Sequence, residues 1–213
     1  FEFGNEVYHG DHQKIRRVYP EEYAQKYIKY HEQMKAVDPS MELGCVLYDY
    51  GWNRKVAEIL KGNIDFGISH IYLSPRGDVS KMNPKEIYRI TLALPVIKYR
   101  NGIADMSVFT KLNNERTIPL AITEFNGGFV QDKPVPYRHC LGTALLNAEL
   151  LKIFMQPKNN VLMANYWQFV NEYWGMVANG FDDDYKDMYK PYYKRPNFYV
   201  YKLYHENFGD TLL

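Results

Sequence analysis

Five times along the sequence, a short and continuously apolar run is followed by a longer segment with helical periodicity. The apolar runs predict strands at 1–3, 42–47, 64–72, 118–123 and 161–169, and the periodic segments predict helices at 20–37, 52–61, 84–98, 137–155 and 197–207. Strands that are apolar throughout, rather than alternating, are buried on both faces, as in a parallel sheet covered by helices. The sequence therefore predicts an α/β fold with a parallel sheet.

Two architectures satisfy this pattern, the doubly wound open sheet and the (β/α)8 TIM barrel. A doubly wound nucleotide-binding protein carries a Gly-rich phosphate loop after its first strand, and no such loop follows residues 1–3. Instead, Asn5 and Glu6 follow the first predicted strand, and Glu124 follows the strand at 118–123. Barrel enzymes place their active sites at such strand ends, so the pattern favours the barrel.

A closed barrel of this type has eight strands, whereas the sequence contains five strand–helix units and opens directly on a strand. We therefore expect residues 1–213 to form a partial catalytic (β/α) barrel domain that supplies strands 4 to 8. The N-terminal strands of the same barrel are expected on a missing segment or on a separate chain, which would then be a partner of this one.

Proline and glycine set the expected ends of several helices. Pro20 suits the first turn of a helix, and Pro39 cannot continue it. Gly62 is expected to close the helix at 52–61. Pro95 is expected to kink or end the helix at 84–98.

Charge and cysteine content argue against several classes of function. The formal net charge of +1 gives no reason to expect nucleic acid or an anionic membrane as a partner. No apolar run approaches the ~18 residues that a membrane span requires. Two cysteines can form neither a disulfide framework nor a thiolate metal site. The compartment, cytoplasmic or secreted, stays open, as does assembly into a homo-oligomer.

Two other groups of residues are candidate metal ligands. His9 and His12 lie in one loop without a third ligand nearby in the sequence, so exposed histidines are the favoured interpretation. Residues 182–184, all aspartates, lie close to Asp187 but lack the glycine and the final glutamate of an EF-hand loop. A solvated acidic turn is the favoured interpretation there, and no metal or organic cofactor is expected.

Glu6 and Glu124 together indicate a reaction, because the strand ends of one barrel converge on one pocket. Glycoside hydrolysis needs two carboxylic acids that flank the bond to be cleaved, one protonated and one ionised. Aromatic residues, which include 20 tyrosines and three tryptophans, make up 16% of the chain. Their faces suit sugar rings, but on composition alone the favoured interpretation is that they pack a core and coat a surface.

Four blocks of sequence resemble glycoside hydrolase family 51, whose best-known members are α-L-arabinofuranosidases of clan A. The blocks are FEFGNE, followed by a helix, VDPS, a strand and WN; then DFGISHIY; then AITEFN; and finally VLMANYWQFVN. They keep the order of the family and extend over nearly the whole chain. The segment after Glu6 (VYHGDHQKIRRVYP) and the pair Tyr166 and Trp167 depart from the family pattern.

The resemblance implies a role for each matching residue. Glu6 matches the general acid/base and Glu124 the nucleophile of a retaining enzyme. Asn5 matches the residue that binds the sugar 2-hydroxyl. Tyr72 matches a tyrosine that hydrogen-bonds the nucleophile. The remaining substrate-binding candidates are His70, Trp167 and Gln168.

The expected function is that of a retaining α-L-arabinofuranosidase, which removes terminal arabinofuranosyl residues from plant-type polysaccharides or oligosaccharides by double displacement. A xylosidase, a glucuronidase or an endoglucanase of the same clan is the alternative within this class. A catalytically silent carbohydrate-binding barrel is the alternative outside it. The two carboxyl groups of a retaining enzyme are expected ~5–5.5 Å apart.

Overall fold

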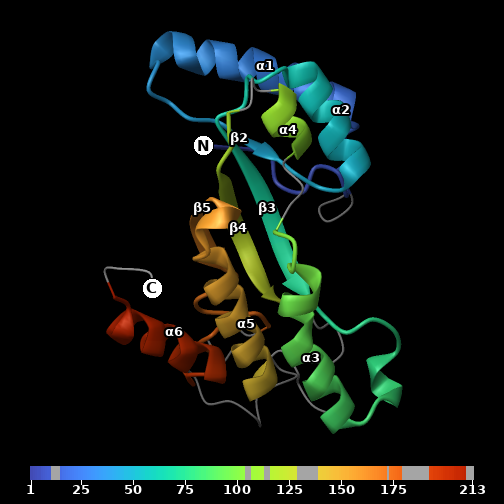
Figure 1. The fold of residues 1–213 in the computed structure, drawn as a ribbon, viewed down its shortest axis with the longest axis vertical. Coiled ribbons are helices and arrows are strands. Elements are labelled where there is room, and N and C mark those ends of the chain that lie inside the picture. The colour runs from blue at the N-terminus through green and yellow to red at the C-terminus, as the bar shows by residue number, and fades with distance from the viewer. Residues whose placement is uncertain are drawn as a thin grey trace. The chain divides into compact units, whose positions relative to one another are not determined.

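The computed structural model describes residues 1–10, 15–103, 107–112, 116–128, 139–171, 173–178 and 192–209 (Figure 1). The chain divides into two compact units. Unit 1 comprises Phe1–His70, Gly102–Thr123 and Pro157–Met163, and unit 2 comprises Ile71–Asn101, Glu124–Gln156 and Ala164–Leu213.

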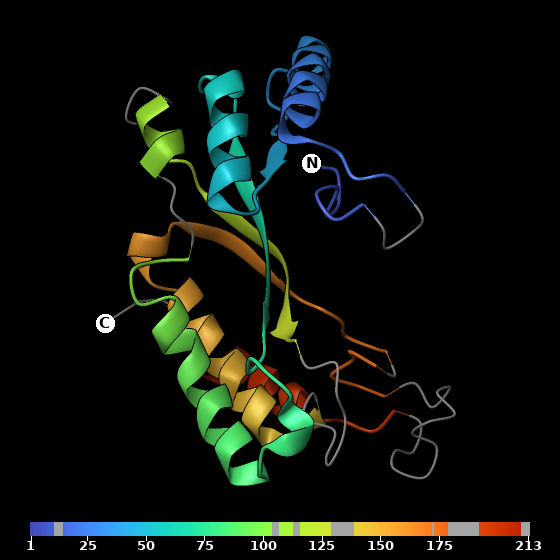
Figure 2. The same cartoon turned by 90° about the vertical axis from the view of Figure 1, so that its right-hand side faces the viewer.

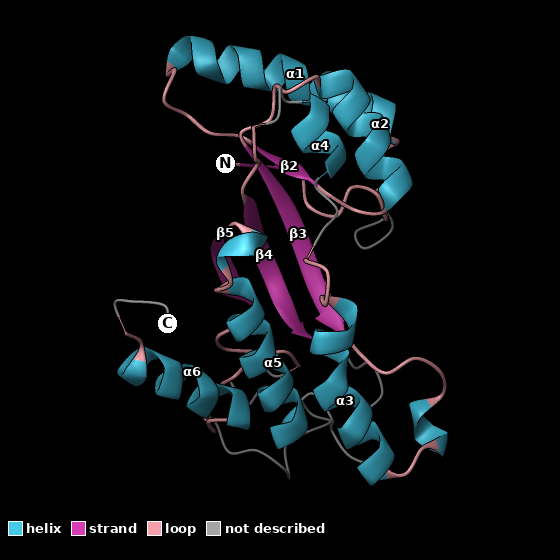
Figure 3. Ribbon diagram, in the orientation of Figure 1, coloured by secondary structure: helices cyan, strands magenta, loops and turns pink. Residues whose placement is uncertain are grey.

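Strands alternate with helices along the described residues, as the sequence predicts, except that α4 follows α3 without a strand between them (Figure 3). The elements, in chain order, are β1 (Glu2–Phe3), α1 (Pro20–Val37), β2 (Gly44–Val46), α2 (Tyr50–Leu60), β3 (Phe66–Leu73), η1 (Val79–Lys81), α3 (Pro84–Lys98), α4 (Ser107–Leu112), β4 (Leu120–Gly127), α5 (Leu141–Phe154), η3 (Pro157–Asn159), β5 (Val161–Tyr166) and α6 (Pro196–Asn207). None of the helices among these residues is both long enough and apolar enough to cross a membrane.

The five strands form one sheet in the order β1-β2-β3-β4-β5. The pairs β1–β2 and β2–β3 are parallel, with Glu2 opposite Gly44 and Gly44 opposite Phe66. In a doubly wound sheet the strand order reverses at a switch point, and here it never reverses. A strictly sequential order is that of a (β/α)8 barrel, so the expected partial barrel is confirmed as the fold.

In unit 1, helices α1 and α2 pack against each other and α4 packs against α2 (Figure 1). Two buried tyrosines of α1 attach this helix to the sheet. The Tyr23 hydroxyl donates to the Phe3 carbonyl at 2.9 Å and accepts from the Val46 N–H at 2.8 Å. Tyr27 donates to the Leu43 carbonyl at 2.5 Å. Burial raises the pKa of the Tyr23 hydroxyl well above its ordinary value, so these tyrosines serve the core rather than a sugar site.

In unit 2, α5 packs between α3 and α6 (Figure 2). The core here is aromatic, because the ring of Phe125 lies 5.0 Å from that of Phe154 and 5.9 Å from that of Tyr166. Phe125 directly follows Glu124 along β4. Since successive side chains of a strand face opposite sides, the apolar residue anchors the strand while Glu124 faces the other way.

Pro95 and Gly62 act differently at the ends of α3 and α2. Pro95 lies inside α3 and does not end it, because α3 continues to Lys98 and Tyr99 still donates to the Pro95 carbonyl at 3.0 Å. At the end of α2 the C-cap residue Lys61 is left-handed, with φ of 48°, and Gly62 closes the helix as expected, with φ of 87°. The short helix α4 was not expected, since its six residues are too few for a periodic signal.

Candidate active site

Glu6 lies in a tight turn three residues after β1. Two backbone angles in this turn are left-handed, φ of 85° at Gly4 and 44° at Glu6. A Cβ atom at Gly4 would lie 2.9 Å from Cγ1 of Val7, so only glycine fits there. For a glutamate, the left-handed conformation costs about 1–3 kcal/mol, and such strain is concentrated at functional sites. The turn therefore fixes the direction of the Glu6 side chain.

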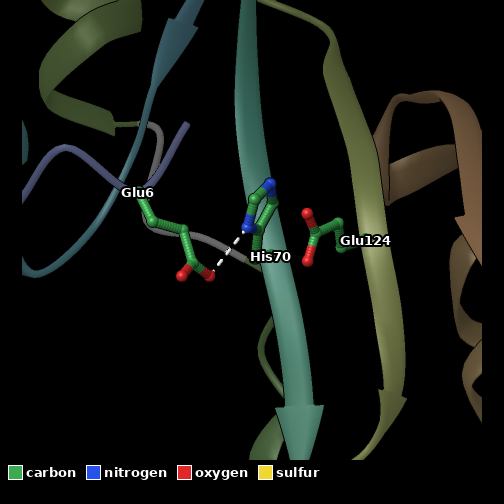
Figure 4. Close-up of side chains that lie close together, drawn as sticks. All are labelled: Glu6, His70 and Glu124. Carbon is green, nitrogen blue, oxygen red and sulfur yellow. Dashed lines mark hydrogen bonds and ion pairs between the residues drawn. The ribbon is translucent and has the colours of Figure 1, made fainter. Parts of the chain in front are cut away.

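The carboxyl group of Glu6 is held by His70 on β3 (Figure 4). Nδ1 of His70 lies 2.9 Å from Oε1 of Glu6, and Nε2 lies 3.0 Å from the hydroxyl of Thr123 on β4. The His70 side chain is only 6% exposed and that of Glu6 is 18% exposed. Glu2 also faces the imidazole, with its carboxyl 3.7 Å from Nε2. Sequence reasoning named His70 but missed the role of Thr123, which lies in the block AITEFN without any sign there of its bond to His70.

Glu124 is held in unit 2 by Tyr72, whose hydroxyl donates to Oε2 at 2.7 Å. This is the hydrogen bond that the resemblance implies. The Tyr72 ring in turn lies 5.4 Å from the ring of Trp174. The sequence predicts that Glu124 follows its strand. In the structure it lies within the strand, because β4 extends to Gly127. A strand residue has less freedom than a loop residue, so this position favours a precisely oriented carboxylate.

A buried asparagine network lies two residues beyond Glu124 on the same strand. Nδ2 of Asn126 donates to the Trp167 carbonyl at 2.6 Å and to the Trp174 carbonyl at 3.3 Å. Its Oδ1 accepts from Nδ2 of Asn147 on α5 at 3.0 Å. The network fixes the backbone of both tryptophans next to β5. The motif AITEFN contains Asn126, but its sequence gives no sign that the side chain bonds these carbonyls.

The other predicted residues occupy the loops around these strands. Asn5 is exposed in the turn that carries Glu6. Trp167 and Gln168 directly follow β5, joined by a cis peptide bond, and the Gln168 carbonyl accepts from the Met176 N–H at 3.0 Å. His9 is exposed. His12 and residues 182–187 lie outside the described part of the chain.

Among the residues that the structure describes, the group that could hold a metal ion is Glu6, His70 and Glu124, drawn in Figure 4. Both ring nitrogens of His70 already take part in hydrogen bonds, to Glu6 and Thr123. A metal bound to His70 would have to displace one of these bonds. The hydrogen bonds therefore favour proton chemistry at Glu6 over metal ligation.

The fold is a partial (β/α) barrel of five sequential strands with their helices. No protein-family model matches the sequence, and no curated protein matches it either. Solved structures do match. An α-L-arabinofuranosidase from Thermotoga maritima, in its arabinose complex, superposes with a TM-score of 0.61 and 23% identity, over 83% of this chain and 35% of that one.

Two further structures extend the comparison. The family 51 α-L-arabinofuranosidase AbfB from Bifidobacterium longum gives a TM-score of 0.66 and 18% identity, over 95% of this chain and 43% of that one. BuGH86, crystallised with neoagarooctaose, gives a TM-score of 0.59 and 18% identity, over 91% of this chain and 32% of that one. The chain thus spans about a third to two fifths of the length of these relatives, and at such identities the similarity establishes the fold.

Proposed function

We propose that the protein is a retaining glycoside hydrolase in which Glu124 is the nucleophile and Glu6 the general acid/base. One observation carries the proposal: β3 holds the hydrogen-bonding partners of both glutamates. His70 binds Glu6, and Tyr72, two positions further along, binds Glu124. Side chains at i and i+2 of a strand face the same side, about 7 Å apart. The partners of both glutamates therefore lie on the same face of β3, which supports a reaction that needs two carboxyl groups.

Two displacements at the anomeric carbon make up the reaction. A carboxylate oxygen of Glu124 bonds to this carbon while the glycosidic C–O bond breaks, and Glu6 gives its proton to the leaving oxygen. Glu6 then removes a proton from water, and the water oxygen displaces Glu124 from the sugar. The configuration is inverted twice and hence retained.

Glu6 must keep its position both with and without its proton. A neutral imidazole has one donor and one acceptor nitrogen, so His70 can accept from the protonated form of Glu6 or donate to the carboxylate. The Thr123 hydroxyl, on the other ring nitrogen, can also donate or accept. Either tautomer of His70 is satisfied, and the bond to Glu6 can persist through both steps.

An arabinofuranoside is the proposed substrate, since two of the similar structures are α-L-arabinofuranosidases. BuGH86 combines the same fold with neoagarooctaose, so the fold alone does not select the sugar. The support for arabinose is the resemblance of the four sequence blocks. The deciding test uses the protein with its complete barrel and compares aryl α-L-arabinofuranoside, β-D-xyloside, β-D-glucoside and β-D-glucuronide.

We expect hydrolysis of the arabinofuranoside with retention of configuration. NMR of the first-formed product measures this configuration. A different preferred glycoside would reject the substrate and keep the mechanism. Inversion would reject the mechanism. Binding of a glycoside without turnover would instead assign a carbohydrate-binding barrel.

We also propose that three further strands, on a preceding segment or a separate chain, complete the barrel. Leu162 and Met163 of β5 support this, because both apolar side chains are exposed. In a closed barrel β5 would pair with the first strand, and the added strands and helices would cover both faces from which these side chains project. Limited proteolysis and unfolding of residues 1–213, alone and with the preceding segment, provide the test. Cooperative unfolding of residues 1–213 alone, with unchanged stability on addition of the segment, would reject it.

A further inference from the structure

Three buried asparagines connect the helices of unit 2 to β4. Asn126 lies on β4, Asn147 on α5 and Asn197 in the first turn of α6, and none of them is more than 1% exposed. Nδ2 of Asn147 donates to Oδ1 of Asn126 at 3.0 Å and to Oδ1 of Asn197 at 2.9 Å. Turning the Asn147 amide would place an oxygen against two oxygens, so its neighbours fix its orientation.

Asn147 in turn fixes the amide of Asn126. Oδ1 of Asn126 accepts from Asn147 and also from the Gly127 N–H at 2.7 Å, so both lone pairs of this oxygen are used. The Nδ2 group must therefore face the Trp167 carbonyl, at 2.6 Å, and the Tyr166 hydroxyl, at 3.1 Å. Without the donor on α5, the Asn126 amide could turn and present its oxygen to the Trp167 carbonyl, which would repel it.

The second tryptophan of unit 2, Trp174, depends on the same orientation. Its carbonyl accepts from Nδ2 of Asn126 and from the Tyr166 hydroxyl, both at 3.3 Å. The Trp174 ring lies 5.4 Å from the ring of Tyr72, which holds the proposed nucleophile Glu124. A chain of hydrogen bonds thus leads from α5 to the backbone of both tryptophans, and one of these rings packs against the partner of the nucleophile.

Asn147 is an unfavourable residue for the packing of α5 alone. The helix is rich in leucine and alanine (LGTALLNAELLKIF), and Oδ1 of Asn147 has no hydrogen-bonding partner among the described residues. A buried acceptor without a partner destabilises a fold, whereas a leucine at this position would extend the apolar surface of the helix. The asparagine therefore serves the network rather than the stability of its own helix.

We propose that Asn147 is a positioning residue for the reaction. From the helix layer it sets the amide of Asn126, and through this amide it holds Trp167 and Trp174 in place beside the sugar that bonds to Glu124. Asn147 itself does not touch the substrate, because it is fully buried on α5. The proposal rests on the proposed function, because it takes Glu124 as the nucleophile.

The test removes the donor of Asn147 in two ways. Asn147→Leu is close in size to the original, suits a helix and adds no charge. Asn147→Asp also lacks Nδ2, and it presents a carboxyl oxygen to Asn126. Tyr204→Phe is the matched control, because the Tyr204 hydroxyl on α6 donates to the Ala148 carbonyl on α5 at 2.9 Å. This bond joins the same two helices but involves none of the three asparagines.

Two measurements are made on the protein with its complete barrel. The first is fluorine NMR after labelling with fluorotryptophan, in which each resonance is assigned by replacing that tryptophan with phenylalanine. Trp52 is the internal reference, since its indole lies in unit 1 and donates to the Val46 carbonyl at 3.0 Å. The second measurement is kcat/KM on the preferred aryl glycoside.

We expect both Asn147 variants to move the Trp167 and Trp174 resonances and to leave that of Trp52 in place. They should lower kcat/KM by about tenfold, the effect of roughly one lost hydrogen bond. Tyr204→Phe should change neither quantity. If Asn147→Asp does not fold, Asn147→Leu decides.

Unchanged Trp167 and Trp174 resonances in folded Asn147→Leu would overturn the proposal. An equal shift of the Trp52 resonance, or an unchanged kcat/KM in an active enzyme, would overturn it as well. Moved Trp167 and Trp174 resonances in a protein whose wild type hydrolyses no glycoside would reject the proposed function and keep the positioning of the tryptophans by Asn147.

Discussion

Replacing Tyr72 by Phe removes one hydroxyl and leaves the ring, so it isolates the hydrogen bond to Glu124. That bond is 2.7 Å long and its acceptor is a carboxylate. Hydrogen bonds to charged groups contribute about 1.5–3 kcal/mol. Since about 1.4 kcal/mol corresponds to a factor of ten in rate, Tyr72→Phe should lower kcat/KM by about 10- to 150-fold. The ring contact with Trp174 at 5.4 Å remains, so the local packing should survive.

The assay compares kcat/KM of wild type and Tyr72→Phe on an aryl α-L-arabinofuranoside, together with the midpoint of unfolding. Tyr204→Phe is the matched control, because the Tyr204 hydroxyl donates to the Ala148 carbonyl at 2.9 Å, also in unit 2. That variant should lose about 0.5–1.5 kcal/mol of stability and keep its activity. Full activity in Tyr72→Phe, or equal loss of activity in both variants, would show that the bond to Glu124 has no catalytic purpose.

The remaining predictions concern the pair of glutamates, the threonine behind the histidine, and a buried thiol. Glu124→Ala should abolish turnover, and azide should restore it with a product of inverted configuration. Glu6→Ala should chiefly slow the hydrolysis of substrates with poor leaving groups. Azide rescue with inversion in Glu6→Ala instead would exchange the two roles. Thr123→Val should shift the pH profile of kcat/KM, whereas Thr123→Ser should not, because only valine removes the hydroxyl from His70; identical profiles would reject the role of that hydroxyl. Burial raises the pKa of Cys45 to about 12, so Cys45 of the folded protein should not react with a thiolate-specific reagent at pH 8. The protein should also become less stable as the pH rises above about 8.5, because the thiol then ionises in the unfolded state only. Rapid labelling of Cys45 in the native protein would contradict this.

The helices show how far local sequence determines structure here. The expected bounds of α1 and α3 are those observed, since Pro20 and Pro84 each occupy a first turn and apolar residues recur at helical spacing. Every expected strand is also present, although β2 and β5 are shorter than predicted. These features depend on neighbours within a few residues, which the sequence displays directly.

Strand ends were less predictable, and Glu124 shows the reason. Nothing within a few residues of Glu124 indicates that β4 continues to Gly127. The strand continues because neighbouring segments of the chain bind it: the Trp167 N–H donates to the Phe125 carbonyl at 3.1 Å, and the Gly128 N–H donates to the Leu73 carbonyl at 2.8 Å. Both partners are remote in sequence, so local propensity cannot reveal them.

The sequence by itself thus determined the class of fold, the two candidate carboxylates and, through its resemblance to a family, the bond between Tyr72 and Glu124. Only the tertiary structure decided that His70 binds Glu6 across 64 positions of sequence, with Thr123 on its other nitrogen. Periodicity and motifs indicate only the local structure of the segment in which they occur. The register of parallel strands joined by whole helices decides which side chains meet, and no local pattern encodes that register.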